Sequence, residues 1–251
     1  MNVKLVLLVA IVGLLGESTK AQHRQVGGEP VVIRDYPFVA AIGYLQEYCG
    51  NGAIIQRRWI LSTASTFYKQ PYWQYDVAVA TDDYRDDHKW YEVDKVYTPS
   101  DWVGWDHNIA LVKLKEDLVY SVVVQPINMA DEDWIRPLDV TMLSFGTNED
   151  FTSHLRVATY TLTTDESCLD WIDEASRKES IYLGHAYCLI PPDFTSRAVY
   201  YNDVGAPVVK DNKLYGLLAY TKHDGAPSDV AIVTRVPFFK SWVESNMIRL
   251  G

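Results

Sequence analysis

The 251-residue sequence has few cysteines, a deficit of basic residues and only one long apolar run. Three cysteines are an odd number, so at least one of them lacks an intramolecular disulfide partner. The 23 lysines and arginines stand against 33 aspartates and glutamates, for a formal net charge of -10. This charge argues against nucleic acids and anionic membranes as partners. No Asn-x-Ser/Thr sequon occurs, which excludes an N-linked glycan.

The long apolar run lies at the N-terminus. Lys4 precedes the apolar segment 5–15, and a polar stretch follows that ends at Ala21. The run is too short to span a bilayer and has the pattern of a secretory signal peptide. We therefore expect residues 1–21 to be removed and the mature chain to be secreted and extracellular, with no membrane partner. Removing two lysines and one glutamate with this segment changes the net charge from -10 to -11, which favours either solubility or a basic protein partner.

Two of the three cysteines form the candidate disulfide. Cys168 and Cys188 bracket a loop of about 20 residues, and closing it would contribute on the order of 3 kcal/mol. Cys49 then remains unpaired. It is either a buried thiol that packs as a small hydrophobe or one half of an intermolecular disulfide.

Short runs rich in Val, Ile, Tyr and Leu, broken by Gly, Pro, Asp and Asn, predict an all-β sandwich or barrel rather than βαβ units. The predicted strands are 38–45, 52–62, 77–81, 109–113, 157–162, 214–220 and 230–236. The last stretch differs, because Phe239, Trp242, Val243 and Met247 recur at helical spacing after Pro237. We expect a terminal helix over 236–250 that packs one apolar face on the body.

Five segments in collinear order carry a family likeness: RQVGG at 24–28, CGNGAIIQRRWILSTAST at 49–66, NIALV at 108–112, NDVGAPVV at 202–209 and TRV at 234–236. Across essentially the whole mature chain they resemble the trypsin/chymotrypsin family of serine proteases. The resemblance implies a two-barrel chymotrypsin-like fold with a C-terminal helix. It divides the mature chain into a short propeptide-like segment, 22–24, and a peptidase S1-like domain, 25–251, with the boundary between barrels near 130.

The resemblance places Ser65, Asn108 and Val204 at the positions of the family's catalytic histidine, aspartate and serine. Proteolysis needs a nucleophile, a base within hydrogen-bond reach and a carboxylate that orients the base. Valine cannot attack a carbonyl, and neither serine nor asparagine acts as a base near neutral pH. We therefore predict a pseudoprotease with no catalytic residue.

Two neighbours of Asn108 could in principle replace the missing groups. In a continuous strand, His107 would point to the opposite face from Asn108 and so away from the cleft. Asp106 would share the face of Asn108 but lie about 6.6 Å along the strand, beyond a direct hydrogen bond. A rearranged triad is therefore not expected.

The binding positions are also altered. The primary pocket that the resemblance defines comprises Ala198, Tyr200, Tyr201, Ala219, Tyr220 and Thr221. Ala198 provides no anion for a basic side chain, and Thr221 in place of glycine should crowd the pocket mouth. The two tyrosines either block the pocket or fill a relaxed core.

The segment before Val204 is partly retained. Asn202 replaces an oxyanion-hole glycine, and Asp203 matches the aspartate that pairs with the new amino terminus after activation. Cleavage after Arg24 would expose Gln25, whose amine can be lost by cyclisation, so we doubt an activation switch. Asp82, Asp83, Asp86 and Asp87 fall near a calcium loop of some relatives, but a solvated loop is the simpler interpretation. We predict no metal and no cofactor.

Among inactive members of the family, the very short segment 22–24, the loss of all three catalytic residues and the absence of a clip domain resemble the scabies mite inactivated serine protease paralogues, relatives of mite trypsin-like allergens. The resemblance implies secretion into the gut lumen and binding of host complement or other cascade proteins. Two alternatives remain: an endogenous non-catalytic cofactor of an arthropod protease cascade, and a residual hydrolase with a rearranged site.

Overall fold

The computed structural model describes residues 28–69, 71–131, 136–146, 152–172, 175–192, 199–221 and 230–250, apart from the side chains of Ser176, Arg177 and Tyr201. The predicted signal peptide, the segment 22–24, the Arg24–Gln25 bond and Ala198 lie outside the described residues.

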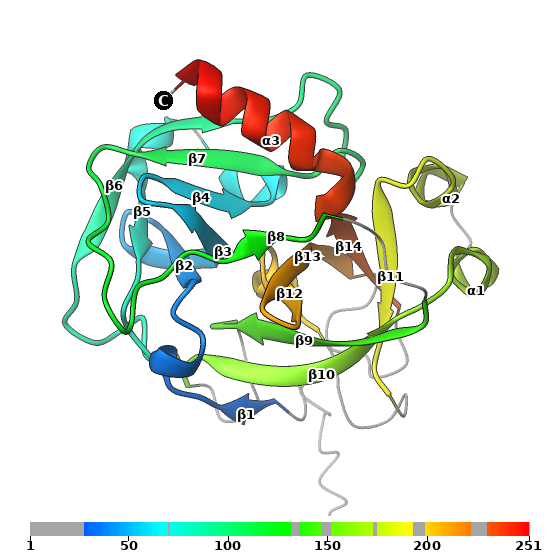
Figure 1. Cartoon of the computed structure of the whole chain (residues 1–251), viewed down its shortest axis with the longest axis horizontal. Coiled ribbons are helices and arrows are strands. Elements are labelled where there is room, and N and C mark those ends of the chain that lie inside the picture. Colours follow the sequence, from blue (N-terminus) through cyan, green and yellow to red (C-terminus); the bar gives the residue numbers. More distant parts are fainter. Residues whose placement is uncertain are drawn as a thin grey trace, which may run out of the picture.

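Six antiparallel strands close into a first barrel, which lies on the left in Figure 1. Around the barrel the order is β2 (Val39–Tyr44), β3 (Glu47–Gln56), β4 (Trp59–Ser62), β7 (Ala110–Leu114), β6 (Trp90–Tyr97) and β5 (Tyr75–Ala78). Its interior is filled by fully buried side chains that include Ile42, Ile54, Ile60 and Tyr75. The barrel therefore has its own closed hydrophobic core and no open sheet edge.

The second barrel is formed in the same way from the C-terminal half of the chain. Its order is β9 (Leu138–Ser144), β12 (Pro207–Lys210), β13 (Lys213–Thr221), β14 (Ala231–Arg235), β11 (Ala186–Ile190) and β10 (Arg156–Leu162), and β10 closes it by pairing with β9. Two short strands extend the sheet: β1 (Glu29–Pro30) pairs with β10, and β8 (Asn128–Met129) runs parallel to β13. Tyr160, Tyr187 and Tyr215 dominate its interior.

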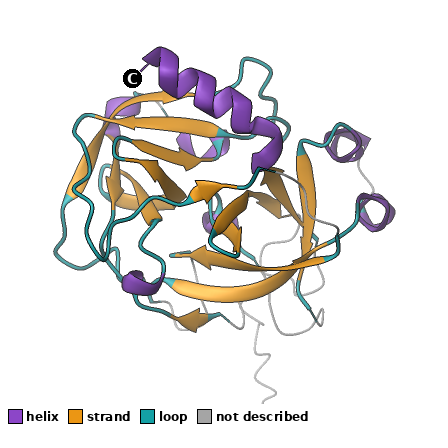
Figure 2. Ribbon diagram, in the orientation of Figure 1, coloured by secondary structure: helices purple, strands orange, loops and turns teal. Residues whose placement is uncertain are grey.

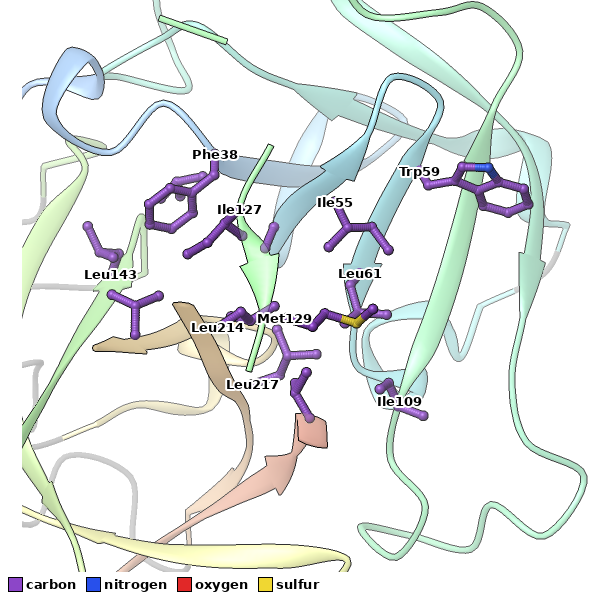
Figure 3. Close-up of a cluster of buried hydrophobic side chains, with 14 of the residues drawn as sticks. Phe38, Ile55, Trp59, Leu61, Ile109, Ile127, Met129, Leu143, Leu214 and Leu217 are labelled. Carbon is purple, nitrogen blue, oxygen red and sulfur yellow. The ribbon is translucent and has the colours of Figure 1, made fainter. Parts of the chain in front are cut away.

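A third core holds the two barrels together. Figure 3 shows Ile55, Leu61 and Ile109 of the first barrel region converging with Leu143, Leu214 and Leu217 of the second. Leu61, Ile109, Leu143, Leu214 and Leu217 are each 0% exposed. Burial of this apolar surface fixes the relative position of the barrels, because separating them would return it to water.

Helix α3 (Val236–Leu250) packs across this junction (Figures 1 and 2). Phe239 and Val243 are buried in the core between the barrels, and Trp242 and Met247 pack against it. The predicted terminal helix is confirmed, as are the two barrels. Among the described residues, no helix combines the length and the apolar character that crossing a bilayer requires.

Strands β6, β9, β11 and β12 were not among the predicted runs, and the structure differs from the sequence prediction at further elements. The run 52–62 is not one strand, because Arg57 and Arg58 turn the chain between β3 and β4. Two short helices, α1 (Asp165–Trp171) and α2 (Ala175–Tyr182), were not predicted. The signal for α1 is a capping residue, since Ser167 N donates to Thr164 Oγ1 at 3.2 Å.

The disulfide joins Cys168 of α1 to Cys188 of β11, with Cα atoms 5.4 Å apart. Both cysteines are buried in a small apolar cluster with Ile172, Ile181 and Ile232. The bond and this cluster attach α1 and α2 to the second barrel, and Cys49 is a free thiol.

Candidate functional site

A cleft of about 560 Å³ lies where residues of the two barrels meet. The first barrel contributes Tyr48 and Cys49 of β3, with Ser65 and Tyr68 from the segment after β4. The second barrel contributes its lining from two segments: Tyr200, Asn202 and Val204, and the end of β13 from Leu218 to Thr221. The volume is typical of a site for a small molecule or a peptide side chain.

The three predicted triad positions meet at this cleft. Ser65 N donates to Asn108 Oδ1 at 2.9 Å, and Asn108 Nδ2 donates to Ser65 Oγ at 3.0 Å. Asn108 is 1% exposed, and its Nδ2 also reaches the carbonyl of Ala219 at 3.5 Å. Val204 lines the same cleft as Ser65. The fold therefore brings the three positions together as the sequence resemblance implied, and two of them form a closed polar pair.

The chemistry available to this group is limited by its residue types. The Asn108 amide has no lone pair that is basic near neutral pH, and its oxygen is occupied by a backbone N–H. Ser65 Oγ donates to Thr63 Oγ1 at 3.4 Å. In the described part of the chain, no imidazole or carboxylate contacts Ser65. The group can hold a ligand by hydrogen bonds, but it offers no base beside a nucleophile.

The rest of the cleft wall is largely aromatic. The Tyr220 ring lies 4.7 Å from the ring of Trp105, so a residue of the 101–108 segment supports the second-barrel side of the cleft. Thr221 is 9% exposed and lines the cleft, as does Tyr200. Tyr48 stacks on Tyr84 at a centroid distance of 4.6 Å. Blocking of the pocket by Tyr200 and Tyr201 stays a prediction, since the Tyr201 side chain and Ala198 lie outside the described residues.

Asp203 is fully buried and held by protein donors. Ser144 Oγ donates to its Oδ1 at 2.6 Å, and the backbone N–H of Tyr200 donates to its Oδ2 at 2.7 Å. Gly146 lies so close that a Cβ there would meet Asp203 Oδ1 at 2.0 Å. These contacts offset the cost of burying a carboxylate. Residues 201–203 form a 3-10 turn, and the Asn202 carbonyl accepts from the Tyr48 hydroxyl at 2.8 Å.

Sequence reasoning missed Asn51, which links the two barrels beneath the cleft. Its Nδ2 donates to Ser144 Oγ at 3.0 Å and to the Asp203 carbonyl at 3.2 Å, and its Oδ1 accepts from Phe145 N at 2.9 Å. Its backbone N–H donates to the carbonyl of Val204 at 2.9 Å. Asn51 is 0% exposed. The only available signal was a polar asparagine between two glycines in C-G-N-G at 49–52.

Gly205 packs against Asn51 beneath the cleft. Its φ is +79°, and a Cβ would meet the Asn51 carbonyl at 2.1 Å and Ser62 Oγ at 2.6 Å. Only glycine fits both the backbone conformation and the space. Packing between the barrels is therefore sufficient to explain why a glycine follows Val204.

The Cys49 thiol lines the cleft and is only partly exposed. Burial raises its pKa to about 12, and Lys69 only partly offsets this effect. The thiol is therefore neutral near pH 7, where the thiolate is the nucleophilic form. This favours the interpretation of Cys49 as an unreactive packing residue.

The predicted placement of Asp106 was wrong. Asp106 Oδ1 lies 2.7 Å from His185 Nδ1 and accepts from Ser180 Oγ at 2.8 Å, so its carboxylate turns to the second barrel and not to the face of Asn108. The expected strand does not extend over these residues, because β7 begins at Ala110 and His107 has a φ of +50°. His107 does face away from Ser65, but a left-handed residue and not strand alternation turns it.

This second polar cluster has the wrong order for a catalytic triad. In a triad the imidazole lies between the hydroxyl and the carboxylate. Here the Asp106 carboxylate lies between Ser180 and His185. Burial alone would raise the pKa of Asp106, but hydrogen bonds from His185 and Ser180 outweigh it and lower that pKa.

Two aspartates of the acidic run 82–87 accept hydrogen bonds from the protein backbone. Asp82 accepts a hydrogen bond from Ile33 N, and Asp83 Oδ1 accepts from Arg85 N at 2.9 Å. Asp83 Oδ2 also lies 3.4 Å from His154 Nδ1. Asp86 and Asp87 are exposed. Two of the four carboxylates are thus engaged by the protein itself, which favours the loop interpretation over a calcium site.

Comparisons with known proteins agree with this architecture. The model of the Trypsin family matches residues 25–243. Serine protease 41 of Homo sapiens is 23% identical over 259 residues, which cover 92% of this chain and 80% of the relative. The vitellin-degrading protease of Bombyx mori is 23% identical over 262 residues, which cover 100% of this chain and 97% of the relative. The solved structure of neuropsin, a serine protease expressed in the limbic system of mouse brain, matches with a TM-score of 0.75 and 18% identity, over 88% of this chain and 98% of that one. The chain therefore belongs to the trypsin family.

Proposed function

We propose that this protein is a secreted, catalytically inactive member of the trypsin family that acts by binding other proteins, with host complement or a related proteolytic cascade as its target. The observation that carries the proposal is the pairing of Ser65 with Asn108 beside Val204. Each of the three positions lacks the chemical group that peptide-bond attack requires.

The size of the catalytic deficit supports this function. Members of a catalytic triad act as a unit, and losing them lowers kcat by roughly 10⁶-fold in a well-studied protease. No described residue supplies a substitute at the cleft, since the nearby Asp106 and His107 turn toward His185. A residual hydrolase would therefore need a rearrangement of the segment before β7.

The surface near the cleft is suited to protein recognition. Leu45, Tyr68 and Trp73 are 61%, 69% and 68% exposed, and Tyr68 also lines the cleft. Leu45 N donates to the Gln74 carbonyl, which places the tip between β2 and β3 beside the turn that carries Trp73. Exposed aromatic side chains on loops of a rigid scaffold are frequent anchors of protein interfaces.

The acidic charge gives a second element of recognition. Of the 82–87 run, Asp86 and Asp87 are exposed and free to meet a basic partner, whereas Asp82 and Asp83 support the local backbone. The likeness to mite inactivated paralogues supports complement as the target and the gut lumen as the site of action. An endogenous cofactor of an arthropod cascade would use the same surface, so only the partner distinguishes the two.

A complement lysis assay with human serum tests the proposal. Because the catalytic positions are not used, Val204→Ala should inhibit lysis as strongly as the parent chain. Trp73→Ala combined with Asp86→Lys and Asp87→Lys should weaken inhibition several-fold, and higher ionic strength should weaken it further. Val119→Ala, on another exposed segment, is the matched control.

Two results would contradict the proposal. Cleavage of a complement protein by the parent chain would make it an enzyme. Absence of inhibition in every complement pathway, together with no protein captured from serum, would favour an endogenous partner. Protein captured instead from arthropod haemolymph would identify that partner by mass spectrometry.

A further inference from the structure

Two histidines and an aspartate meet on the side of Asn108 that faces away from Ser65. Asp106 and His107 precede β7 of the first barrel, and His185 precedes β11 of the second. One carboxylate oxygen of Asp106 lies 2.7 Å from His185 Nδ1, and the other lies 3.3 Å from His107 Nδ1. Within the described ranges, this is the one group of three or more His, Cys, Asp or Glu residues whose ligand atoms all lie within 4.8 Å of each other.

A second carboxylate lies beside the ring of His107. Asp101 Oδ2 lies 3.1 Å from His107 Nε2, on the far side of the ring from Asp106. This carboxylate favours a proton on Nε2, and in that neutral tautomer Nδ1 carries a lone pair. A carboxylate that binds the distal nitrogen of an imidazole is the usual support of a histidine metal ligand.

The remaining nitrogen of His107 is unsatisfied. Nδ1 is buried and has no hydrogen-bond partner, although Asp106 Oδ2 is 3.3 Å away. With the proton on Nε2, two lone pairs face each other across this distance. Such an arrangement is costly in a buried place unless a cation lies between the two atoms, either a proton on Nδ1 that makes an ion pair with Asp106 or a metal ion.

We propose that Asp106, His107 and His185 bind a first-row transition-metal ion, of which Zn²⁺ fits best. Two imidazole nitrogens and one carboxylate oxygen are a common zinc ligand set, and Ca²⁺ and Mg²⁺ prefer oxygen alone. Ligand atoms around a tetrahedral zinc ion are about 3.3 Å apart. With Asp106 Oδ2 as the ligand, its 3.3 Å distance to His107 Nδ1 meets this value, whereas His185 Nδ1 contacts the other oxygen, Oδ1, at 2.7 Å and must shift to reach the ion.

The surroundings suit a bound ion. The side chains of His185 and His107 are 8% and 17% exposed, and that of Asp106 is 30% exposed, so the site is sheltered but reachable. The rings of Phe238 and Phe239 lie 4.6 and 5.5 Å from His185 and His107, respectively. On binding, the metal takes the place of the proton between His185 Nδ1 and Asp106 Oδ1. That proton moves to Nε2 of a neutral ring, or to water from a protonated one, and the fourth position is left for water.

The ion would act as a clamp between the barrels. Its ligands come from the segment before β7 and from the start of β11, which the disulfide also holds. Next to His107, the carbonyl of Asn108 already accepts a hydrogen bond from Thr234 Oγ1 of β14 at 2.7 Å. A ligand that binds only the folded chain stabilises it by mass action. Sequence patterns did not predict the site because 79 residues separate Asp106 from His185.

Metal binding to the full mature chain tests the proposal. Untagged protein is stripped with a chelator and dialysed against micromolar Zn²⁺, and its metal content is then measured. We expect one zinc ion per chain, a higher Tm with zinc than with chelator, and with Co²⁺ the visible absorption of a tetrahedral site. His107→Gln and His185→Gln should each weaken binding at least tenfold. His154→Gln, whose ring pairs with Asp83 elsewhere, should leave it unchanged.

The exposed Asp101 provides a variant that should not disturb folding. Asp101→Asn should weaken zinc binding about tenfold, because it removes the carboxylate that supports the distal nitrogen of a metal-bound His107. Less than one ion per chain, or one ion whose affinity does not change in His107→Gln and His185→Gln, would overturn the proposal. The cluster would then be an ion-paired contact between the barrels.

Discussion

Ser65 and Asn108 satisfy each other through two hydrogen bonds, one in each direction, at 2.9 and 3.0 Å. In the trypsin family the corresponding histidine accepts the proton of the nucleophilic serine, and the corresponding aspartate orients the imidazole and stabilises its positive charge. Here the backbone N–H of Ser65 and the Asn108 amide form a neutral contact. The pair still joins the segment after β4 to the residues just before β7. Serine and asparagine, however, cannot perform the acid–base chemistry of the triad.

Restoring the nucleophile alone should therefore not restore activity. Val204→Ser introduces a hydroxyl into the cleft, but the neutral Ser65–Asn108 pair cannot deprotonate it. We expect no rise in hydrolysis of peptide or ester substrates above the parent chain, and no labelling by serine-directed phosphonates. Val204→Ala is the matched control. Stoichiometric labelling of the introduced hydroxyl would contradict this view of the site.

A complete triad should still give a poor trypsin-like protease. The variant Ser65→His, Asn108→Asp and Val204→Ser contains every triad group, but Ala198 offers no anion for a basic substrate side chain. We expect kcat/KM for cleavage after arginine to stay at least 10³-fold below that of an ordinary trypsin, a ratio in line with loss of a buried charge partner. Efficient cleavage after arginine would show that the primary pocket was misread.

Much of the fold could be predicted because local sequence patterns indicate many of its strands and its terminal helix. Several strand runs, although not β6, β9, β11 and β12, and the helical spacing of Phe239 and Val243 are readable within a few residues. The triad positions could be placed because the motifs around Ser65, Asn108 and Val204 keep their order. The two missed helices are short, and α2 has no strong apolar face that would mark it in the sequence.

Contacts between distant segments could not be predicted in this way. Asn51 and Ser144 are 93 residues apart, and neither an asparagine nor a serine in a sequence indicates that it has a buried partner. The error at Asp106 had a local cause, since strand alternation was extended over His107, whose φ of +50° breaks it. Histidine tolerates this left-handed conformation better than most residues. The sequence around a histidine does not indicate when the residue adopts that conformation.

Asn51 should be a large contributor to stability. Asn51→Ala removes a donor to Ser144 and the Asp203 carbonyl and an acceptor for Phe145 N, all buried. Leaving such groups unsatisfied costs roughly 1–3 kcal/mol each, so we expect a loss of about 3 kcal/mol in the free energy of unfolding. Urea denaturation measures it, with Asn128→Ala at an exposed position as control. A loss no greater than that of the control would mean that the barrels do not depend on this network.

A buried carboxylate in the first barrel gives a pH-dependent test. Asp76 of β5 is 9% exposed, and its Oδ1 has no hydrogen-bond partner. Burial raises its pKa from 3.8 to about 6, because backbone donors only partly offset the loss of water. Below the pKa of the unfolded chain, 3.8, the Asp76 carboxyl is neutral in both the folded and the unfolded state. Its burial then has no ionisation cost for the free energy of unfolding.

As pH rises from about 4 to 6, the unfolded chain ionises first, so the parent chain loses stability across this window and no more above it. Asp76→Asn removes the ionisable group while keeping its shape. We expect the variant to be more stable than the parent at pH 7, by about 1–2 kcal/mol, and the difference to vanish below about pH 4. Thermal unfolding at both pH values measures this, with Asp94→Asn on the exposed side of β6 as control. A gain that persists at low pH, or a loss at pH 7, would show that the Asp76 carboxylate is compensated in the fold.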